Sequence, residues 1–190
     1  RPRGAWAWAW RGEAKLQTGD YEGARKDLSR ALALDPGLGW AWGWRGRAWR
    51  ELGDERRALR DLNKAVRLEP LDAYARAWRG RARHRLGDFR GALADLRRAA
   101  ELDQKTSWIH LWKGEAARAR GLLAQAEADF DRSLGVDRKN IAAMVARAAL
   151  RLRRKNASGA REDMDAAFTA APEDALARYG VVAHYVRLRF

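Results

Sequence analysis

Small and apolar residues recur along the chain at helical spacing inside a longer period of 34 residues. Four glycines, Gly12, Gly46, Gly80 and Gly114, follow one another at this interval. A period of this length is typical of stacked helical hairpins, each of which buries its apolar side against its neighbours. The pattern therefore predicts an all-α fold made of helix-turn-helix repeats. The expected repeats are residues 5–38, 39–72, 73–106, 107–140 and 141–174.

Turn residues divide each repeat into two helices. A Gly-Asp dipeptide marks the corner in the first three repeats, because glycine accepts a positive φ at a helix end and the aspartate can cap the next helix. Proline then stops the second helix. In the last repeat Lys155-Asn156 replaces the Gly-Asp dipeptide. The dipeptides are Gly19-Asp20, Gly53-Asp54 and Gly87-Asp88, and the prolines are Pro36, Pro70 and Pro172.

These markers resemble the tetratricopeptide repeat over nearly the whole chain. In the second repeat the family's Trp, Gly, Ala, large apolar and Pro positions fall on Trp42, Gly46, Ala58, Leu62 and Pro70. The resemblance implies a right-handed superhelical α-solenoid that forms one elongated domain. It also implies that the first helix of every repeat lines a concave groove.

The two ends of the chain depart from the repeat pattern. We expect residues 1–4 to be a frayed N-terminal edge and residues 175–190 to form one capping helix over the last apolar side. The chain starts without Met and inside an expected helix, which indicates a piece of a larger protein.

A basic residue and an aspartate 16 positions later recur in all five repeats. The basic residue takes a slot where the family most often has leucine. Five coincidences in five repeats predict an ion pair between the two helices of each repeat; the alternative is an arginine array that contacts a ligand. The pairs are Arg11–Asp27, Arg45–Asp61, Arg79–Asp95, Lys113–Asp129 and Arg147–Asp163.

In the first four repeats, two aromatic residues per repeat occupy the side of the first helix that faces away from the core. In tetratricopeptide arrays this side lines the groove, so the resemblance implies an aromatic ladder there. Exposed apolar area of that extent is typical of an interface. The alternative is that the rings pack on one another, on a second copy or on a segment outside this chain. The aromatic residues are Trp6, Trp10, Trp40, Trp44, Tyr74, Trp78, Trp108 and Trp112.

Basic side chains lie beside the aromatic ones, and Trp and Arg are the residues that dominate binding hot spots. An extended peptide with an acidic or C-terminal stretch is therefore the expected ligand, held by charge-assisted bonds. A glycan or single-stranded nucleic acid is the alternative, because both stack on aromatic faces. The basic residues are Arg47, Arg50, Arg81, His84, Arg85 and Arg118.

Composition narrows the function further. The net charge is +14 and there is no cysteine, which excludes disulfides and thiolate metal sites. The sequence contains neither a run of about 18 apolar residues nor a targeting signal, so the default expectation is a cytoplasmic protein that does not insert into membranes. Catalytic motifs are absent as well. We expect a protein-binding scaffold without cofactor or metal rather than an enzyme, or else the recognition domain of a larger enzyme.

Overall fold

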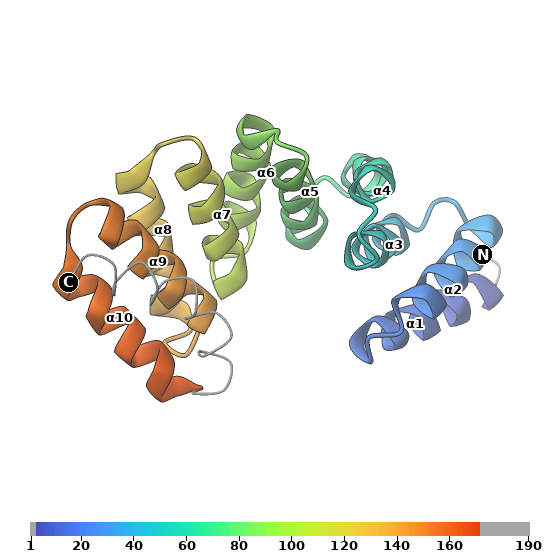
Figure 1. The fold of residues 1–190 in the computed structure, drawn as a ribbon. Coiled ribbons are helices and arrows are strands. Elements are labelled where there is room, and N and C mark those ends of the chain that lie inside the picture. The colour runs from blue at the N-terminus through green and yellow to red at the C-terminus, as the bar shows by residue number, and fades with distance from the viewer. Residues whose placement is uncertain (1–2, 172–190) are drawn as a thin grey trace. The chain divides into compact units, whose positions relative to one another are not determined.

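The structure, a computed structural model, describes residues 3–171 (Figure 1). Within this range the chain forms ten α-helices and no β-strand, which confirms the predicted all-α solenoid of helical hairpins. The expected capping helix, residues 175–190, and Pro172 lie outside the described residues. The helices are α1 (Arg3–Gln17), α2 (Tyr21–Leu34), α3 (Gly39–Glu51), α4 (Glu55–Leu68), α5 (Ala73–Arg85), α6 (Phe89–Leu102), α7 (Ser107–Ala119), α8 (Leu123–Val136), α9 (Ile141–Arg153) and α10 (Ala157–Ala170).

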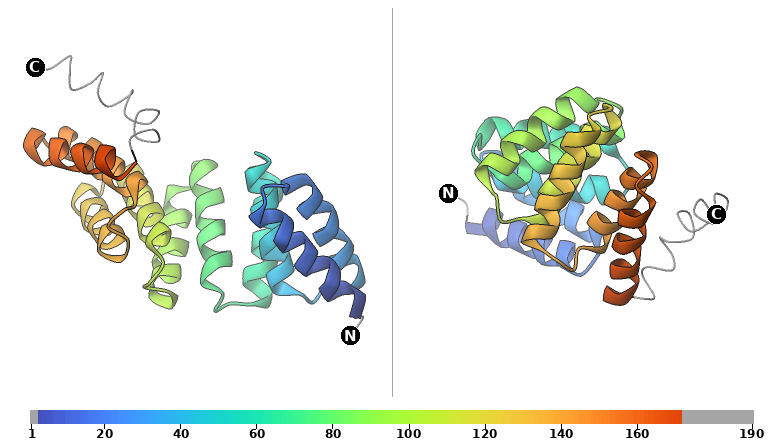
Figure 2. Two further views of the ribbon diagram at one scale, coloured as in Figure 1. Left: turned by 90° about the horizontal axis from the view of Figure 1, so that it is seen from below. Right: turned by 90° about the vertical axis from the view of Figure 1, so that its left-hand side faces the viewer.

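The chain divides into two compact units, Arg1–Asp103 and Gln104–Phe190. The first unit contains α1 to α6, and the second contains α7 to α10. In each unit every odd-numbered helix packs on the even-numbered helix that follows it. The blue pair α1 and α2 can be seen lying side by side in the left view of Figure 2. The single elongated domain of five repeats stays a prediction.

The corners inside the helix pairs have the geometry that the turn residues predicted. Gly53 has a φ of 82°, in the left-handed region that glycine accepts readily. Asp54 then caps α4, because its Oδ1 accepts a hydrogen bond from the Arg57 N–H at 2.8 Å. In the last pair Lys155 takes this positive φ, at 61°, and Asn156 supplies the cap. The same arrangement recurs at Gly19-Asp20 and Gly87-Asp88.

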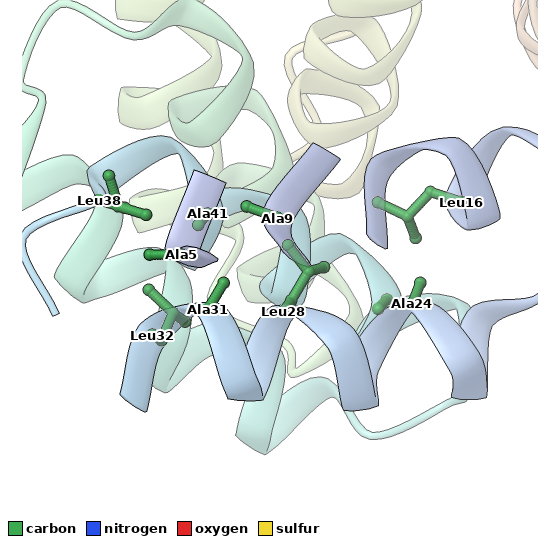
Figure 3. Close-up of a cluster of buried hydrophobic side chains, with 10 residues drawn as sticks. Ala5, Ala9, Leu16, Ala24, Leu28, Ala31, Leu32, Leu38 and Ala41 are labelled. Atoms are coloured by element: carbon green, nitrogen blue, oxygen red, sulfur yellow. The ribbon is translucent and has the colours of Figure 1, made fainter. Parts of the chain in front are cut away.

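The core of the first unit is built from alanines and leucines that both helices of a pair contribute. In Figure 3 Ala5 and Ala9 of α1 face Leu28 and Leu32 of α2. The recurring glycine brings the helices of a pair close together: at Gly46 a Cβ atom would lie 2.6 Å from Leu62 Cγ. Because a carbon atom does not fit at that distance, glycine is the residue that permits this packing.

The predicted ion pairs are present in all five helix pairs. Arg45 Nε and Nη2 donate to Asp61 Oδ2 and Oδ1 at 2.7 and 2.9 Å. Lys113 makes the same link with a single ammonium, whose Nζ lies 2.9 Å from Asp129 Oδ1. All five aspartates are buried, which places these pairs in the scaffold. The remaining three pairs are Arg11–Asp27, Arg79–Asp95 and Arg147–Asp163.

Candidate binding surface

Four indole rings on α1 and α3 form a tryptophan cluster, which consists of Trp6, Trp10, Trp40 and Trp44. Ring centroids lie 5.1 Å apart for Trp6 and Trp40, 5.2 Å for Trp10 and Trp44, and 4.7 Å for Trp40 and Trp44. The rings meet tilted or edge-on, as their quadrupoles favour. Trp10 nevertheless keeps 54% of its surface exposed, while the other three are half-buried. The cluster is therefore both an internal packing unit and a surface.

The two aromatic residues of α5 differ from each other. Trp78 is only 9% exposed, and its ring packs against Gly43 of α3, where a Cβ would lie 3.7 Å from Trp78 Cζ3. Tyr74 is 45% exposed and its ring centroid lies 6.1 Å from that of Trp78. Trp78 therefore contributes mainly to packing, and Tyr74 is the aromatic residue of α5 that remains at the surface. Arg47 of α3 places its guanidinium carbon 5.9 Å from the centre of the Trp78 ring.

A glutamate, Glu55, lies among the predicted basic residues. Sequence analysis did not predict this contact. Glu55, at the start of α4, has a side chain only 11% exposed, and Arg85 Nε lies 2.8 Å from its Oε1. Burial raises the pKa of the Glu55 carboxyl, and the positive charges of Arg85, Arg50 and Arg81 oppose that rise. Two carboxylates thus offset part of the charge of this group, because Arg50 also forms an ion pair with Glu51.

His84 lies at the end of α5 and its ring meets Phe89 edge-on, with 5.2 Å between centroids. The second unit carries the remaining predicted residues. Trp108 and Trp112 of α7 are half-buried, with ring centroids 4.5 Å apart, and Arg118 is half-buried on the same helix. A ladder that continues from the first unit to these residues stays a prediction.

His110 of α7 is the second histidine within the described residues. His110 is buried and its Nε2 lies 3.1 Å from the Gln104 carbonyl oxygen, as a structural histidine does. Within residues 3–171, no group of three or more His, Cys, Asp or Glu side chains is placed to hold a metal ion. None of the helices in that range has the length and apolar character needed to cross a membrane.

Comparison with known proteins gives one family. The tetratricopeptide repeat family matches residues 5–38, and a second profile of the same family matches residues 45–107 and 85–141. A comparison with curated protein sequences gave no match.

Several solved structures have the same fold. PilW, a widely conserved type IV pilus biogenesis factor, has a TM-score of 0.81 at 20% identity, over 90% of this chain and 80% of its own. A thermophilic tetratricopeptide protein from Thermus thermophilus has a TM-score of 0.77 at 23% identity, over 93% and 97% of the two chains. YrrB, a tetratricopeptide protein with an unusual peptide-binding site, has a TM-score of 0.70 at 21% identity, over 91% and 89%.

Identities at this level establish the fold alone. The family assignment depends instead on the sequence profiles, which match residues 5–38 and 45–141. Together with the helical hairpins of the structure, these matches show that the chain belongs to the tetratricopeptide repeat family.

Proposed function

We infer that the chain is a protein-interaction scaffold whose aromatic face binds an extended, acidic peptide segment of a partner. The aromatic face is the side of α1, α3 and α5 that carries the tryptophan cluster, Tyr74 and Arg47. The tetratricopeptide fold generally serves protein–protein interaction. A neighbour of the same fold, YrrB, has a peptide-binding site, which is consistent with this proposal.

The observation that carries the proposal is the exposed ring of Trp10 within the tryptophan cluster. Contacts with Trp40 and Trp44, at 5.7 and 5.2 Å between centroids, hold this ring in place although 54% of the residue is open to solvent. A rigid aromatic surface loses little conformational entropy on binding, so its contact area converts efficiently into affinity. An apolar side chain of a peptide is a suitable occupant.

The indole N–H groups supply a second element of recognition. Trp42, which is outside the cluster, donates its N–H to the Pro36 carbonyl oxygen at 2.9 Å. Among the contacts of residues 3–171, the indole N–H groups of the tryptophan cluster have no protein acceptor. A peptide main chain offers carbonyl oxygens to such donors, because an extended segment has no internal hydrogen bonds of its own.

The acidic preference comes from two arginines of the helices that carry the aromatic residues, Arg47 of α3 and Arg85 of α5. Arg85 is 58% exposed, so a partner carboxylate can reach its guanidinium while Glu55 stays in place. Arg47 lies between the tryptophan cluster and Tyr74 along the chain and is half-buried. Carboxylates in the peptide would form charge-assisted bonds with these two residues, which fixes the direction of the segment.

The test is calorimetric titration of the chain with acidic peptides that alternate Asp or Glu with Leu or Phe. Trp10→Ala is the variant, and Trp49→Ala is its matched control. Trp49 is a half-buried tryptophan of α3 outside the cluster, and its ring is held by Arg25 and Arg57, with guanidinium carbons 5.0 and 4.8 Å from its centre. A hot-spot tryptophan is worth about 2 kcal/mol, so we expect Trp10→Ala to weaken binding roughly 30-fold.

The other ligand classes are outcomes of the same experiment. Binding of chito-oligosaccharides or of oligothymidine, with no binding of the peptides, would refute the peptide proposal. A molecular mass that rises with concentration, and falls back to the monomer value in Trp10→Ala, would show that a second copy covers the aromatic face. Equal loss of peptide binding in the Trp10 and Trp49 variants would show a general effect on folding.

A further inference from the structure

A row of basic residues follows the outer side of α4, opposite the helices of the aromatic face. Arg56, Arg60 and Arg67 are all exposed, and Lys64 beside them is half-buried. At about 100° per residue the three arginines lie within about 40° of one another around the helix. At about 1.5 Å per residue they extend over about 16 Å of its length. These three residues are named the α4 arginine row.

The two acidic residues within α4 are both paired with arginines of other helices. Glu55 pairs with Arg85 of α5, and Asp61 pairs with Arg45 of α3. Glu69, which follows α4, accepts a hydrogen bond from the Trp40 N–H at 3.0 Å. The outer side of α4 therefore carries positive charge that no carboxylate of the helix offsets.

This arrangement destabilises the helix itself. Arg56 and Arg60 are four residues apart, as are Arg60 and Lys64, and like charges at that spacing repel. The equivalent helix α10 carries Arg161 with Asp165 at the same spacing, 3.8 Å apart, which is the favourable combination. A helix face that only contacts solvent does not require like charges four residues apart. A polyanionic ligand that binds the α4 arginine row would offset this repulsion.

We propose that the α4 arginine row binds the phosphate backbone of duplex nucleic acid without reading its sequence. Guanidinium groups bind phosphates in a two-pronged geometry that ammonium groups do not offer. The row covers about 16 Å, which corresponds to roughly five phosphates of one strand at about 3.4 Å per nucleotide of helix axis. The ligand is thus a repeated phosphate rather than one anion.

An anionic membrane is the competing surface, and α4 lacks what membrane binding requires. Amphipathic helices hold to bilayers through apolar side chains that enter the lipid. Those of α4, such as Ala58, Leu62 and Val66, are buried in the protein. The outer side of α4 can therefore contact a ligand only through its charged groups. The regularly spaced phosphates of a polymer match such a row.

The test is fluorescence anisotropy of a labelled duplex of about 25 base pairs, titrated with the chain at several salt concentrations. Non-specific binding of this kind has a Kd of about 10⁻⁴ to 10⁻⁶ M. Three phosphate contacts give a salt slope of about −2.7, so raising the salt from about 50 to about 200 mM should weaken binding about 40-fold. We expect Arg56→Gln/Arg60→Gln/Arg67→Gln to remove this slope and at least 90% of the affinity, a loss of about tenfold or more.

The matched control removes the same charge elsewhere. Arg120, Arg138 and Arg153 are exposed residues of the second unit. If their triple Gln variant weakens duplex binding as much as the α4 variant does, net charge alone explains the binding and the proposal is overturned. Binding to vesicles with about 30% phosphatidylserine, combined with no binding to the duplex, would also overturn it. Trp10→Ala should leave duplex binding unchanged, so this result is independent of the aromatic face.

Discussion

The Arg45–Asp61 pair connects two neighbouring helix pairs of the first unit. Asp61 accepts both bonds from Arg45, and Arg45 Nη1 also donates to Ser29 Oγ of the preceding helix pair at 3.2 Å. The guanidinium carbon lies 4.7 Å from the centre of the Trp42 ring. The Asp61 side chain is 9% exposed and that of Arg45 is 17% exposed. Asp61→Ala therefore leaves a largely buried cation with one weak polar contact.

The expected loss of stability follows from these contacts. Breaking a buried pair by removing one partner costs about 3–5 kcal/mol. Arg45 keeps its contacts with Ser29 and Trp42 and can reach some water, so we expect the lower end, about 3 kcal/mol. For a chain of this size that loss lowers the melting temperature by about 6–12 °C.

The assay is urea and thermal unfolding followed by circular dichroism, with Glu22→Ala as the control. Glu22 is 50% exposed and pairs with Arg25 of its own helix, so its loss should cost about 1 kcal/mol or less. Replacing both partners, as Arg45→Met with Asp61→Leu, should restore most of the stability, because no buried charge remains. Equal melting temperatures for Asp61→Ala and Glu22→Ala would refute the assignment of this pair to the scaffold.

Three further predictions concern the charged groups of the scaffold. The hydrogen bond from Arg11 lowers the pKa of Asp27, so its stabilisation is present above the ordinary pKa and is lost as the pH falls through the lowered one. In urea titrations, the stability advantage of the native chain over Asp27→Asn should be constant above about pH 5 and should shrink below about pH 4. Lys113→Arg should raise the free energy of unfolding by about 1 kcal/mol, because Asp129 Oδ2 is buried without a hydrogen bond and arginine has a second N–H that can donate to it. A lower melting temperature would show that the site has no room for the arginine side chain. Burial raises the pKa of Glu55, so the folded chain favours the neutral carboxyl. The stability that the neutral carboxyl provides is complete below the ordinary pKa of glutamate and is lost as the pH rises through the raised pKa. Glu55→Gln should therefore be more stable than the native chain at pH 7 and equal to it near pH 4, and lower stability at pH 7 would mean that the ion pair outweighs burial.

Periodicity made the scaffold predictable from the sequence. A contact inside one repeat has to recur in the others, so a side-chain pair that repeats five times at a fixed separation is a contact between helices. Arg45 with Asp61 and Lys113 with Asp129 were identified in this way, and both are ion pairs in the structure. The glycines of the corners, such as Gly53 with its φ of 82°, follow from the same reasoning.

Features that occur in only one repeat were out of reach. The Trp78 ring lies against α3 at Gly43, where the neighbouring repeats have Ala9 and Ala77. A Cβ at Gly43 would lie 3.7 Å from Trp78 Cζ3, which is an ordinary contact distance, so the glycine is not what buries this ring. The sequence placed Trp78 on the surface with the other aromatic residues, whereas it is 9% exposed. Helical angle alone does not separate these cases, because whether a ring is buried depends on the side chain of the adjacent helix.

Glu55 is a further residue of this kind, and it connects the two surfaces. Its side chain turns toward Arg85 and away from the outer side of α4, which removes one negative charge from the α4 arginine row and adds it to the aromatic face. A glutamate at this position whose side chain faced solvent beside Arg56 would offset part of the charge of the row. The burial of this one carboxylate therefore makes one surface less basic and leaves the other uncompensated. For that reason Glu55→Gln should strengthen acidic-peptide binding at the aromatic face and leave duplex binding by α4 unchanged. A parallel increase in both affinities would show that the two surfaces respond only to the net charge of the chain.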